Sequence, residues 1–190
     1  MATLYLIRHG ETDWNKQGRY QGHSDIPLNS QGREQAHDAM NRLHCGAVDA
    51  IYSSDLCRAT ETAEIIASKW SIDVQCDARL REIQQGVWEG MVFEEINARY
   101  GDTVAARRTS PLTVSPPGGE TLAEVRERVL ECVEEIVQRH AGGQVVIVSH
   151  GVALALVRLE SSGADIAAVW GLIQPNAGIE IVELKARDFI

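Results

Sequence analysis

The chain has 190 residues, of which 44% are hydrophobic and 24% charged, and 27 acidic against 18 basic side chains give it a formal net charge of −9. This composition predicts one soluble globular domain over residues 1–190, large enough to bury about two thirds of the surface of its unfolded chain. The acidic balance argues against binding of nucleic acid, because duplex binding needs Lys and Arg side chains that neutralise several phosphates. The longest apolar stretch, Val145 to Val157, is too short to cross a bilayer, which takes about 20 residues, so no membrane contact is expected.

Several common enzyme motifs are missing from the sequence. The four cysteines form no CxxC pair, which argues against a zinc ribbon or a redox dithiol. HExxH, GxxxxGK[ST] and GxGxxG are also absent, so zinc proteases, P-loop proteins and dinucleotide-binding proteins are excluded. The N-terminus lacks the basic start and apolar core of a signal peptide. We therefore expect a cytoplasmic protein with reduced, buried thiols.

Short apolar runs alternate with longer segments of helical period, which is typical of an α/β fold with a mainly parallel sheet. In chain order, the predicted elements are a strand at 3–7, a helix at 30–43, a strand at 50–53, a helix at 55–70, a strand at 72–76, a helix that begins at 121, and strands at 144–149 and 179–184. Most of the strands are rich in Val, Ile and Leu, as buried parallel strands are. The predicted fold is a three-layer sandwich with helices on both faces of the central sheet.

The helix that begins at Thr121 has the clearest signals. Thr121 and Glu124 have the spacing of a capping box, and an apolar stripe continues from Leu122 to Val137 until Gly142 ends the helix. The segment before it, residues 84–119, has weak periodicity and is interrupted by glycines and prolines. We interpret this segment as a small cap inserted into the single domain.

Two predicted strands end in the same way. The first runs into Arg8-His9-Gly10, and the strand at 144–149 runs into His150-Gly151. Ligands of open α/β sheets bind at the carboxyl ends of the strands, so both histidines are expected at the edge where active sites form. Glycine after each histidine lets the backbone turn and lets a ligand approach closely.

A third strand ends at Ser53 and leads into a helix with Arg58 in its first turn. A cation there opposes the positive end of the helix dipole. This unfavourable placement indicates an anion between Arg58 and the helix terminus.

Together these motifs resemble the histidine phosphatase family, which includes phosphoglycerate mutase. The resemblance covers nearly the whole chain and rests on Arg8-His9-Gly10-Glu11-Thr12 with Trp14-Asn15, Arg19-Tyr20-Gln21-Gly22, Leu28 with Gly32, the segment 53–63 with Arg58, Leu80-Arg81-Glu82, Gly86 with Trp88-Glu89-Gly90, the segment 116–121, and Ser149-His150-Gly151. It implies a phosphoglycerate mutase-like fold.

The resemblance also implies roles for individual residues. His9 would be the nucleophile, since a neutral imidazole can attack phosphorus and form phosphohistidine. Arg8, Arg58 and a protonated His150 would surround the phosphoryl oxygens, and Glu82 would act as general acid and base. Substrate-binding positions are expected at Arg8, Asn15, Gln21, Arg58, His150 and Gly151. Because the cationic groups balance the phosphate charge, no metal ion or other cofactor is expected.

Two of the matching residues have structural alternatives. Asn15 is either a further donor to the phosphate or a helix or turn cap, and the sequence does not choose between these roles. Glu11 is expected to anchor the turn after His9 instead of taking part in the chemistry.

The sequence favours a phosphatase over a mutase. The cap is modest, and only 40 residues follow His150, whereas a mutase must exclude water from its phosphoenzyme. Arg107 and Arg108 resemble paired arginines that hold a substrate carboxylate in the mutases, with a solvated charge pair as the alternative. The predicted partner is a small-molecule phosphate ester. A cofactor-dependent phosphoglycerate mutase, a non-catalytic binding protein on the same scaffold and a homodimeric assembly are left open.

Overall fold

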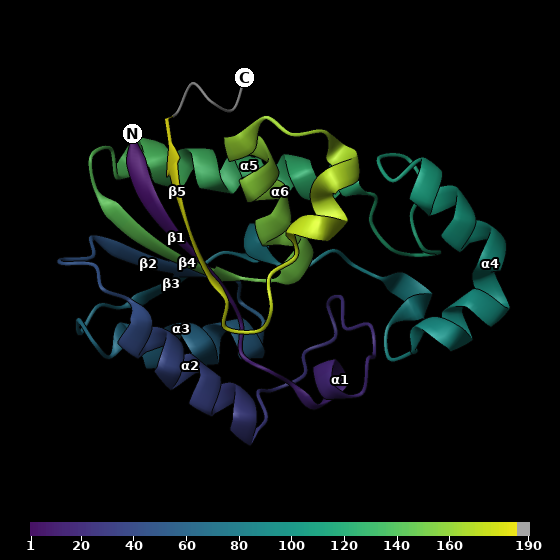
Figure 1. Ribbon diagram of the computed structural model, residues 1–190, viewed down its shortest axis with the longest axis horizontal. Coiled ribbons are helices and arrows are strands. Elements are labelled where there is room, and N and C mark those ends of the chain that lie inside the picture. Colours follow the sequence, from purple (N-terminus) through teal and green to yellow (C-terminus); the bar gives the residue numbers. More distant parts are fainter. Residues whose placement is uncertain (186–190) are drawn as a thin grey trace.

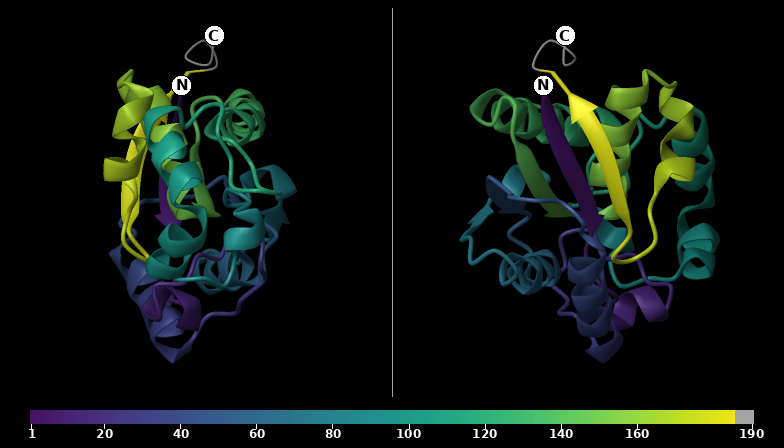
Figure 2. Two further views of the ribbon diagram at one scale, coloured as in Figure 1. Left: turned by 90° about the vertical axis from the view of Figure 1, so that its right-hand side faces the viewer. Right: turned by 60° about the vertical axis from the view of Figure 1, so that its left-hand side comes forward.

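The computed structural model describes residues 1–185 and contains a five-stranded sheet with the strand order β3-β2-β4-β1-β5. The strands are β1 (Ala2–Arg8), β2 (Ala50–Ser53), β3 (Val74–Cys76), β4 (Gln144–Ser149) and β5 (Ile179–Leu184). β1 pairs in parallel with β4, β4 with β2, and β2 with β3, whereas β5 runs antiparallel to β1 at the sheet edge (Figure 2). The predicted mainly parallel sheet is therefore confirmed.

Helices cover both faces of this sheet (Figure 1). α2 (Ser30–Arg42) and α3 (Cys57–Ala67) pack with one set of strand side chains, among them Ile51 and Val146. α5 (Leu122–Arg139) and α6 (Gly151–Ser162) pack with the opposite set, among them Leu4 and Ile147. These are the three layers that the sequence predicts. Among residues 1–185, no helix combines the length and apolar composition needed to cross a membrane.

The amphipathic helix α5 begins as predicted. The Thr121 hydroxyl accepts a hydrogen bond from the Glu124 N–H at 3.2 Å, and the Glu124 carboxylate accepts one from the Thr121 N–H at 2.8 Å. Its apolar stripe is buried against the sheet, including Val125, Val129 and Val133. A polar face consequently remains for interactions with the loops around the site.

The segment predicted as a cap contains the 3₁₀ helix η2 (Gly86–Trp88) and the helix α4 (Phe93–Thr109). A non-helical backbone at Tyr100 (φ −132°, ψ 30°) kinks α4. Trp88, Ile96 and Val104 form a small buried cluster separate from the two faces of the sheet. The kink and the small core account for the weak helical period of this region.

The other short elements are α1 (Asp13–Lys16) and the 3₁₀ helices η1 (Ala78–Leu80) and η3 (Ile166–Leu172). The strand predicted at 72–76 is shorter than expected, because β3 begins only at Val74.

Candidate active site

The two histidine-bearing strands place their histidines side by side. β1 and β4 are parallel neighbours with Arg8 in register with Ser149, so His9 and His150 leave the sheet at the same edge. Their ring centroids are 5.1 Å apart. The sequence predicted this pairing from the repeated strand, histidine and glycine pattern.

His9 is oriented by its own turn. Its Nδ1 lies 2.6 Å from the Gly10 carbonyl oxygen, and since a carbonyl only accepts, Nδ1 carries the proton and Nε2 keeps a free lone pair. The Asn176 amide donates to the carbonyls of both His9 and Gly10 and so holds the turn from behind. Burial, followed by the charges of Arg58 and Arg8, holds the pKa of His9 well below its usual value. His9 is therefore a neutral imidazole near pH 7.

Arg58 lies in the first turn of α3, where the sequence places it, and its side chain is fully buried. Its Nη1 donates to the Ser24 carbonyl and its Nη2 to the Gly22 carbonyl, both at 2.8 Å. The Glu89 carboxylate holds the same turn, because it accepts hydrogen bonds from the N–H groups of His23 and Ser24. Glu89 thus orients Arg58 indirectly.

The side chains of Arg8 and Glu82 both lie close to Gly151. A Cβ placed on Gly151 would lie 3.5 Å from Glu82 Oε2 and 3.7 Å from Arg8 Cζ. Arg8 Nη1 donates to the Gln174 carbonyl, and the Glu82 carboxylate accepts from the Val152 N–H at the start of α6. The predicted acid residue and the predicted phosphate ligand therefore meet at the turn that carries His150.

The charge of His150 depends on its surroundings. Burial, followed by the charges of Arg58, His9 and Arg8, holds the pKa of His150 well below its usual value, so the ring of the protein by itself is neutral, and a protonated ring around the phosphoryl group stays a prediction. Neither ring nitrogen has a hydrogen-bond partner within residues 1–185. A bound phosphate dianion would add the negative charge that favours the protonated ring.

The site also leaves other buried donors unpaired. Arg8 Nε and Arg58 Nε are buried without a partner among the described residues. Buried polar groups are normally hydrogen-bonded, so unpaired buried donors on two arginines whose charges act on His9 indicate a ligand site. Burial lowers the pKa of both arginines, and the nearby Glu82 carboxylate partly offsets this effect.

Asn15 takes the capping role that the sequence left open. Its Oδ1 accepts from the N–H and hydroxyl of Thr12, the N-cap residue of α1, and from the Asn176 amide. Gln21 Oε1 accepts from the same Thr12 hydroxyl. The Nδ2 of Asn15 makes no hydrogen bond within the described chain, so its contact with substrate stays a prediction, as does that of Gln21.

Glu11 accepts from the Asn29 side chain at 2.9 Å and so anchors the turn, in line with its predicted role.

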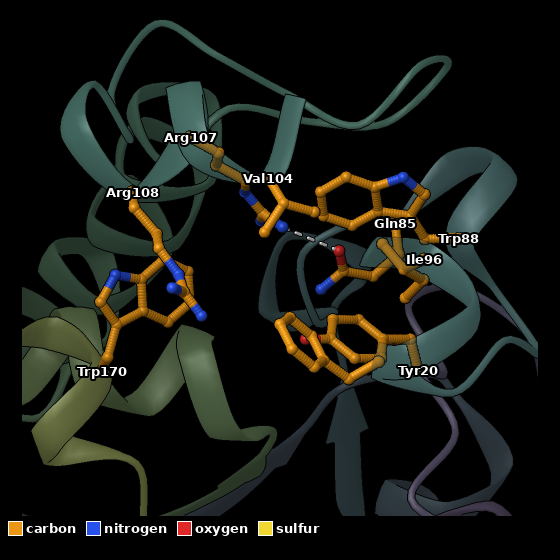
Figure 3. A pocket seen from close by; sticks show the side chains of 9 residues that line it. Tyr20, Gln85, Trp88, Ile96, Val104, Arg107, Arg108 and Trp170 are labelled. Atoms are coloured by element: carbon orange, nitrogen blue, oxygen red, sulfur yellow. Dashed lines mark hydrogen bonds between the residues drawn. The ribbon is translucent and has the colours of Figure 1, made fainter. Parts of the chain in front are cut away.

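A pocket of about 460 Å³ lies beside the site, under the cap (Figure 3). Its lining is mostly aromatic and aliphatic, with two arginines, and consists of Tyr20, Gln85, Trp88, Phe93, Ile96, Val104, Arg107, Arg108 and Trp170. Of the two arginines, Arg107 is only 6% exposed and Arg108 is exposed.

The guanidinium of Arg107 lies between two indole rings. Its Cζ is 5.3 Å from the Trp88 ring centroid and 5.5 Å from that of Trp170, and its Nη1 donates to Gln85 Oε1 at 3.1 Å. Its Nε and Nη2 are buried with no partner in the part of the chain that the structure describes. Arg107 is therefore not the solvated charge considered as an alternative, whereas Arg108 stacks on Phe93, with its Cζ 5.7 Å from the ring centroid.

Sequence reasoning missed the residues that hold this site from behind. Asn176, Glu89 and Arg128 all bind backbone groups next to predicted site residues. Glu89 belongs to one of the motifs that carry the family resemblance, but its contact was not predicted. No short motif marks Asn176 or Arg128, because each acts through a contact distant in sequence. The described residues contain no group of three or more His, Cys, Asp and Glu side chains that could hold a metal ion.

An α/β sandwich with paired histidines and arginines at the carboxyl edge of its sheet defines a class of enzymes that act on phosphate groups. Comparison with known proteins identifies the family within this class. Residues 4–190 match the model of the histidine phosphatase superfamily, branch 1, and the chain belongs to this family.

Relatives with known names agree with this assignment. The chain is 36% identical to phosphoserine phosphatase 1 of Hydrogenobacter thermophilus over 187 residues, which cover 98% of this chain and 89% of the relative. It is 36% identical to a Salmonella choleraesuis protein named "Probable phosphoglycerate mutase GpmB" over 154 residues, or 81% of this chain and 72% of the relative. A mycobacterial glucosyl-3-phosphoglycerate phosphatase, solved as a complex with VO3, superposes with a TM-score of 0.85 at 32% identity and covers 94% of this chain and 90% of its own. The predicted family, fold and phosphatase enzyme class are thus confirmed.

Proposed function

We propose that the protein hydrolyses phosphomonoesters of small metabolites through a phosphohistidine intermediate on His9, in the cytoplasm and without a metal ion. The observation that carries this proposal is the arrangement around His9. A neutral imidazole with a free Nε2 lies beside His150, Arg8 and Arg58, and both ring nitrogens of His150 and the Nε atoms of the two arginines are buried without a partner among residues 1–185. These donors match the charge that develops on a transferring phosphoryl group.

In the first step, His9 Nε2 attacks phosphorus, the N–P bond forms and the bond to the ester oxygen breaks. Glu82, whose carboxyl group lies at the Gly151 turn beside Arg8, gives its proton to the departing alkoxide. The hydrogen bond from His9 Nδ1 to Gly10 stabilises the positive charge that the ring acquires.

In the second step, water attacks the phosphohistidine. The Glu82 carboxylate takes a proton from the water as the new P–O bond forms and the N–P bond breaks. Inorganic phosphate leaves, and Glu82 is protonated for the next cycle.

The pocket under the cap receives the leaving group. Its aromatic and aliphatic walls favour an apolar portion of the substrate, and the unpaired Nε and Nη2 of Arg107 favour a second anionic group such as a carboxylate. We expect Arg107→Met to raise KM more than tenfold for phosphoserine, which carries a carboxylate, and to change KM less for phosphoethanolamine, which has none. Steady-state kinetics with both substrates checks this, and equal changes would contradict an anion-binding role for Arg107.

The function is tested by a screen of phosphorylated metabolites ranked by kcat/KM, with release of inorganic phosphate as the readout. Phosphoserine, 3-phosphoglycerate, a sugar phosphate and α-ribazole phosphate are suitable first members. His9→Ala is the control, and activity that survives this substitution would favour a binding protein with a contaminating phosphatase.

The second candidate is a phosphoglycerate mutase, because several relatives carry the name "Probable phosphoglycerate mutase GpmB". Incubation with 3-phosphoglycerate separates the two activities. Release of inorganic phosphate supports the phosphatase, whereas 2-phosphoglycerate formed faster than phosphate would replace it with the mutase.

A further inference from the structure

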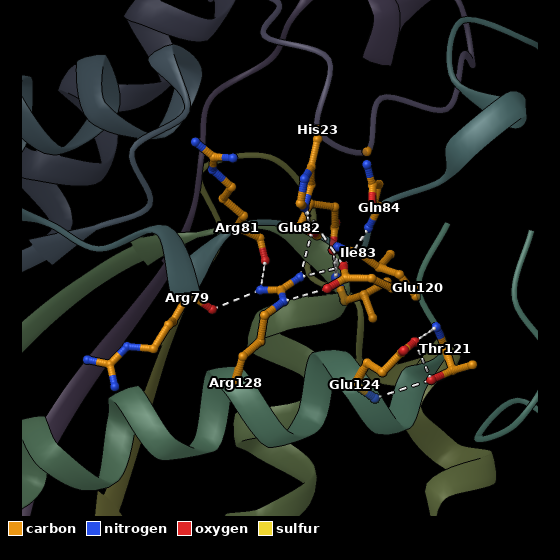
Figure 4. A network of polar contacts seen from close by, with 12 residues as sticks. His23, Arg79, Arg81, Glu82, Ile83, Gln84, Glu120, Thr121, Glu124 and Arg128 are labelled. Carbon is orange, nitrogen blue, oxygen red and sulfur yellow. Dashed lines mark hydrogen bonds and ion pairs between the residues drawn. The ribbon is translucent and has the colours of Figure 1, made fainter. Parts of the chain in front are cut away.

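One guanidinium on α5 makes five hydrogen bonds to the loop that carries Glu82 and to the residue that precedes the helix cap (Figure 4). Arg128 Nη1 donates to the carbonyls of Arg79 and Arg81 at 2.8 and 2.7 Å, and Nη2 donates to the Glu82 carbonyl at 2.9 Å. Nε and Nη2 also donate to the two carboxylate oxygens of Glu120, each at 2.8 Å. Since a guanidinium has five N–H donors, every donor of Arg128 is in use.

The Glu82 backbone is held from a second side as well. His23 Nε2 donates to the same Glu82 carbonyl at 2.9 Å. The Glu120 carboxylate, fixed by Arg128, accepts from the Gln84 N–H at 2.8 Å. Bonds to Arg128 and its partner Glu120 therefore bracket Glu82 on both sides in the sequence.

This support is needed because Glu82 lies outside the regular elements. It sits between η1 and η2, where no strand or helix fixes the backbone. Its side chain, in contrast, must reach the Val152 N–H and the turn at Gly151. A general acid works only within hydrogen-bond reach of the proton acceptor, so a small displacement of this loop would weaken proton transfer.

We propose that Arg128 is a positioning residue for the proton transfer by Glu82, an inference that rests on the proposed phosphatase function. Arg128 makes no contact with the reacting groups and acts through the backbone of residues 79–82. The planar fork is essential, because a Lys ammonium carries the same charge but lacks the paired donors that join three carbonyls to one carboxylate.

The test uses two substrates that differ in their need for an acid. Phosphoserine has an alkoxide leaving group that requires protonation, whereas para-nitrophenyl phosphate has a leaving group that departs without it. We expect Arg128→Lys to lower kcat/KM, which reports phosphoryl transfer to His9 and not the shared hydrolysis of the phosphohistidine, about 10- to 100-fold for phosphoserine, since a misplacement of about 1 Å can cost about 100-fold in rate. The same substitution should lower kcat/KM only a few-fold for para-nitrophenyl phosphate. The Lys variant keeps the positive charge, which also contributes to the low pKa of His150.

Arg126 provides the matched control on the same helix. It forms an exposed ion pair with Glu160 at 2.6 Å and does not bind the 79–82 loop. Arg126→Lys should leave both substrates at wild-type rates. Arg128→Met, which removes all five donors, should show the same selective loss more strongly, and thermal unfolding of each variant checks that it is folded.

A double-mutant cycle with Glu82→Gln completes the test. If Arg128 acts through Glu82, Arg128→Lys should add little further loss with phosphoserine once Glu82 is replaced. Equal losses of kcat/KM for both substrates, no loss for either, or additive losses in the double variant would overturn the positioning role. The proposed function fails separately if the wild-type protein releases no phosphate from either substrate or if His9→Ala retains the activity.

Discussion

At the scale of single residues, the site is dominated by charge and burial. The two central histidines are neutral although they lie among cations, since burial comes first among the causes that lower the pKa of each. Such buried neutral histidines make the stability of the protein depend on pH.

We therefore expect the free energy of unfolding to fall as the pH drops below about 6.5, the usual pKa of histidine in an unfolded chain. Because the folded-state pKa of His150 is lowered, the unfolded chain takes up the proton first, and stability present above pH 6.5 is lost between that value and the folded-state pKa. Each such histidine contributes up to about 1.4 kcal/mol per pH unit within this window. Urea unfolding at several pH values measures the slope.

His150→Asn should flatten this slope, because it removes one of the two groups. His37, which is exposed on α2, provides the control, and His37→Asn should keep the wild-type slope. If His150→Asn and the wild type lose stability equally between pH 7 and pH 5, His150 is already protonated in the folded protein.

The residues at the histidine-bearing edge of the sheet were the predictable ones. His9, His150 and Arg58 could be placed from sequence because strand ends and a helix start bring them to one edge. The low pKa of His150 could not be predicted in this way, since it depends on burial among groups far apart in the chain. Arg128 looks like any surface arginine of an amphipathic helix until the 79–82 loop is seen to pack on it.

At the scale of elements, the close approach of β1 and α2 depends on glycine. A Cβ at Gly10 would collide with the carbonyl oxygen of Gly32 in the first turn of α2. We expect Gly10→Ala to lower the free energy of unfolding by about 1–3 kcal/mol, as for other overpacked sites, and to lower kcat because the displaced carbonyl of Gly10 orients His9. Urea unfolding and steady-state kinetics measure the two effects.

Gly101 is the matched position, because a Cβ there meets no atom within 4 Å and its backbone has no positive φ. Gly101→Ala within α4 should raise stability by up to about 1 kcal/mol, since alanine restricts the unfolded chain more than glycine does. A loss of stability in both variants would show that glycine flexibility, and not the contact with Gly32, determines the loss of stability in Gly10→Ala.

The elements that sequence periodicity predicted are those with one apolar face. α5 has such a face and a capping box, and it begins where predicted. α6 was not predicted, because residues Val152 to Val157 are buried on all sides and show no amphipathic period. In α4, the kink at Tyr100 interrupts the period, so only a cap of undefined structure could be inferred.

At the scale of the whole molecule, a chain with a net charge of −9 concentrates cations at one edge of its sheet. Arg8 and Arg58 lie at the histidine pair, and Arg107 lies in the adjacent pocket. An anion should therefore bind at this edge in spite of the unfavourable overall charge, because close, buried donors act more strongly than distant screened charges.

Inorganic phosphate, the product of the proposed reaction, should consequently stabilise the folded protein. Binding to the folded state alone adds about 2.7 kcal/mol when phosphate is present at 100 times its Kd, and thermal unfolding over a phosphate titration shows this as a rising Tm. Sodium chloride at equal ionic strength should not reproduce the rise. Arg58→Met should abolish most of it, since that substitution removes a buried guanidinium from the histidine pair, whereas Arg33→Met, which breaks only a surface pair with Glu61, should retain it. A phosphate-dependent rise of equal size in both variants would mean that the anion binds away from the paired histidines.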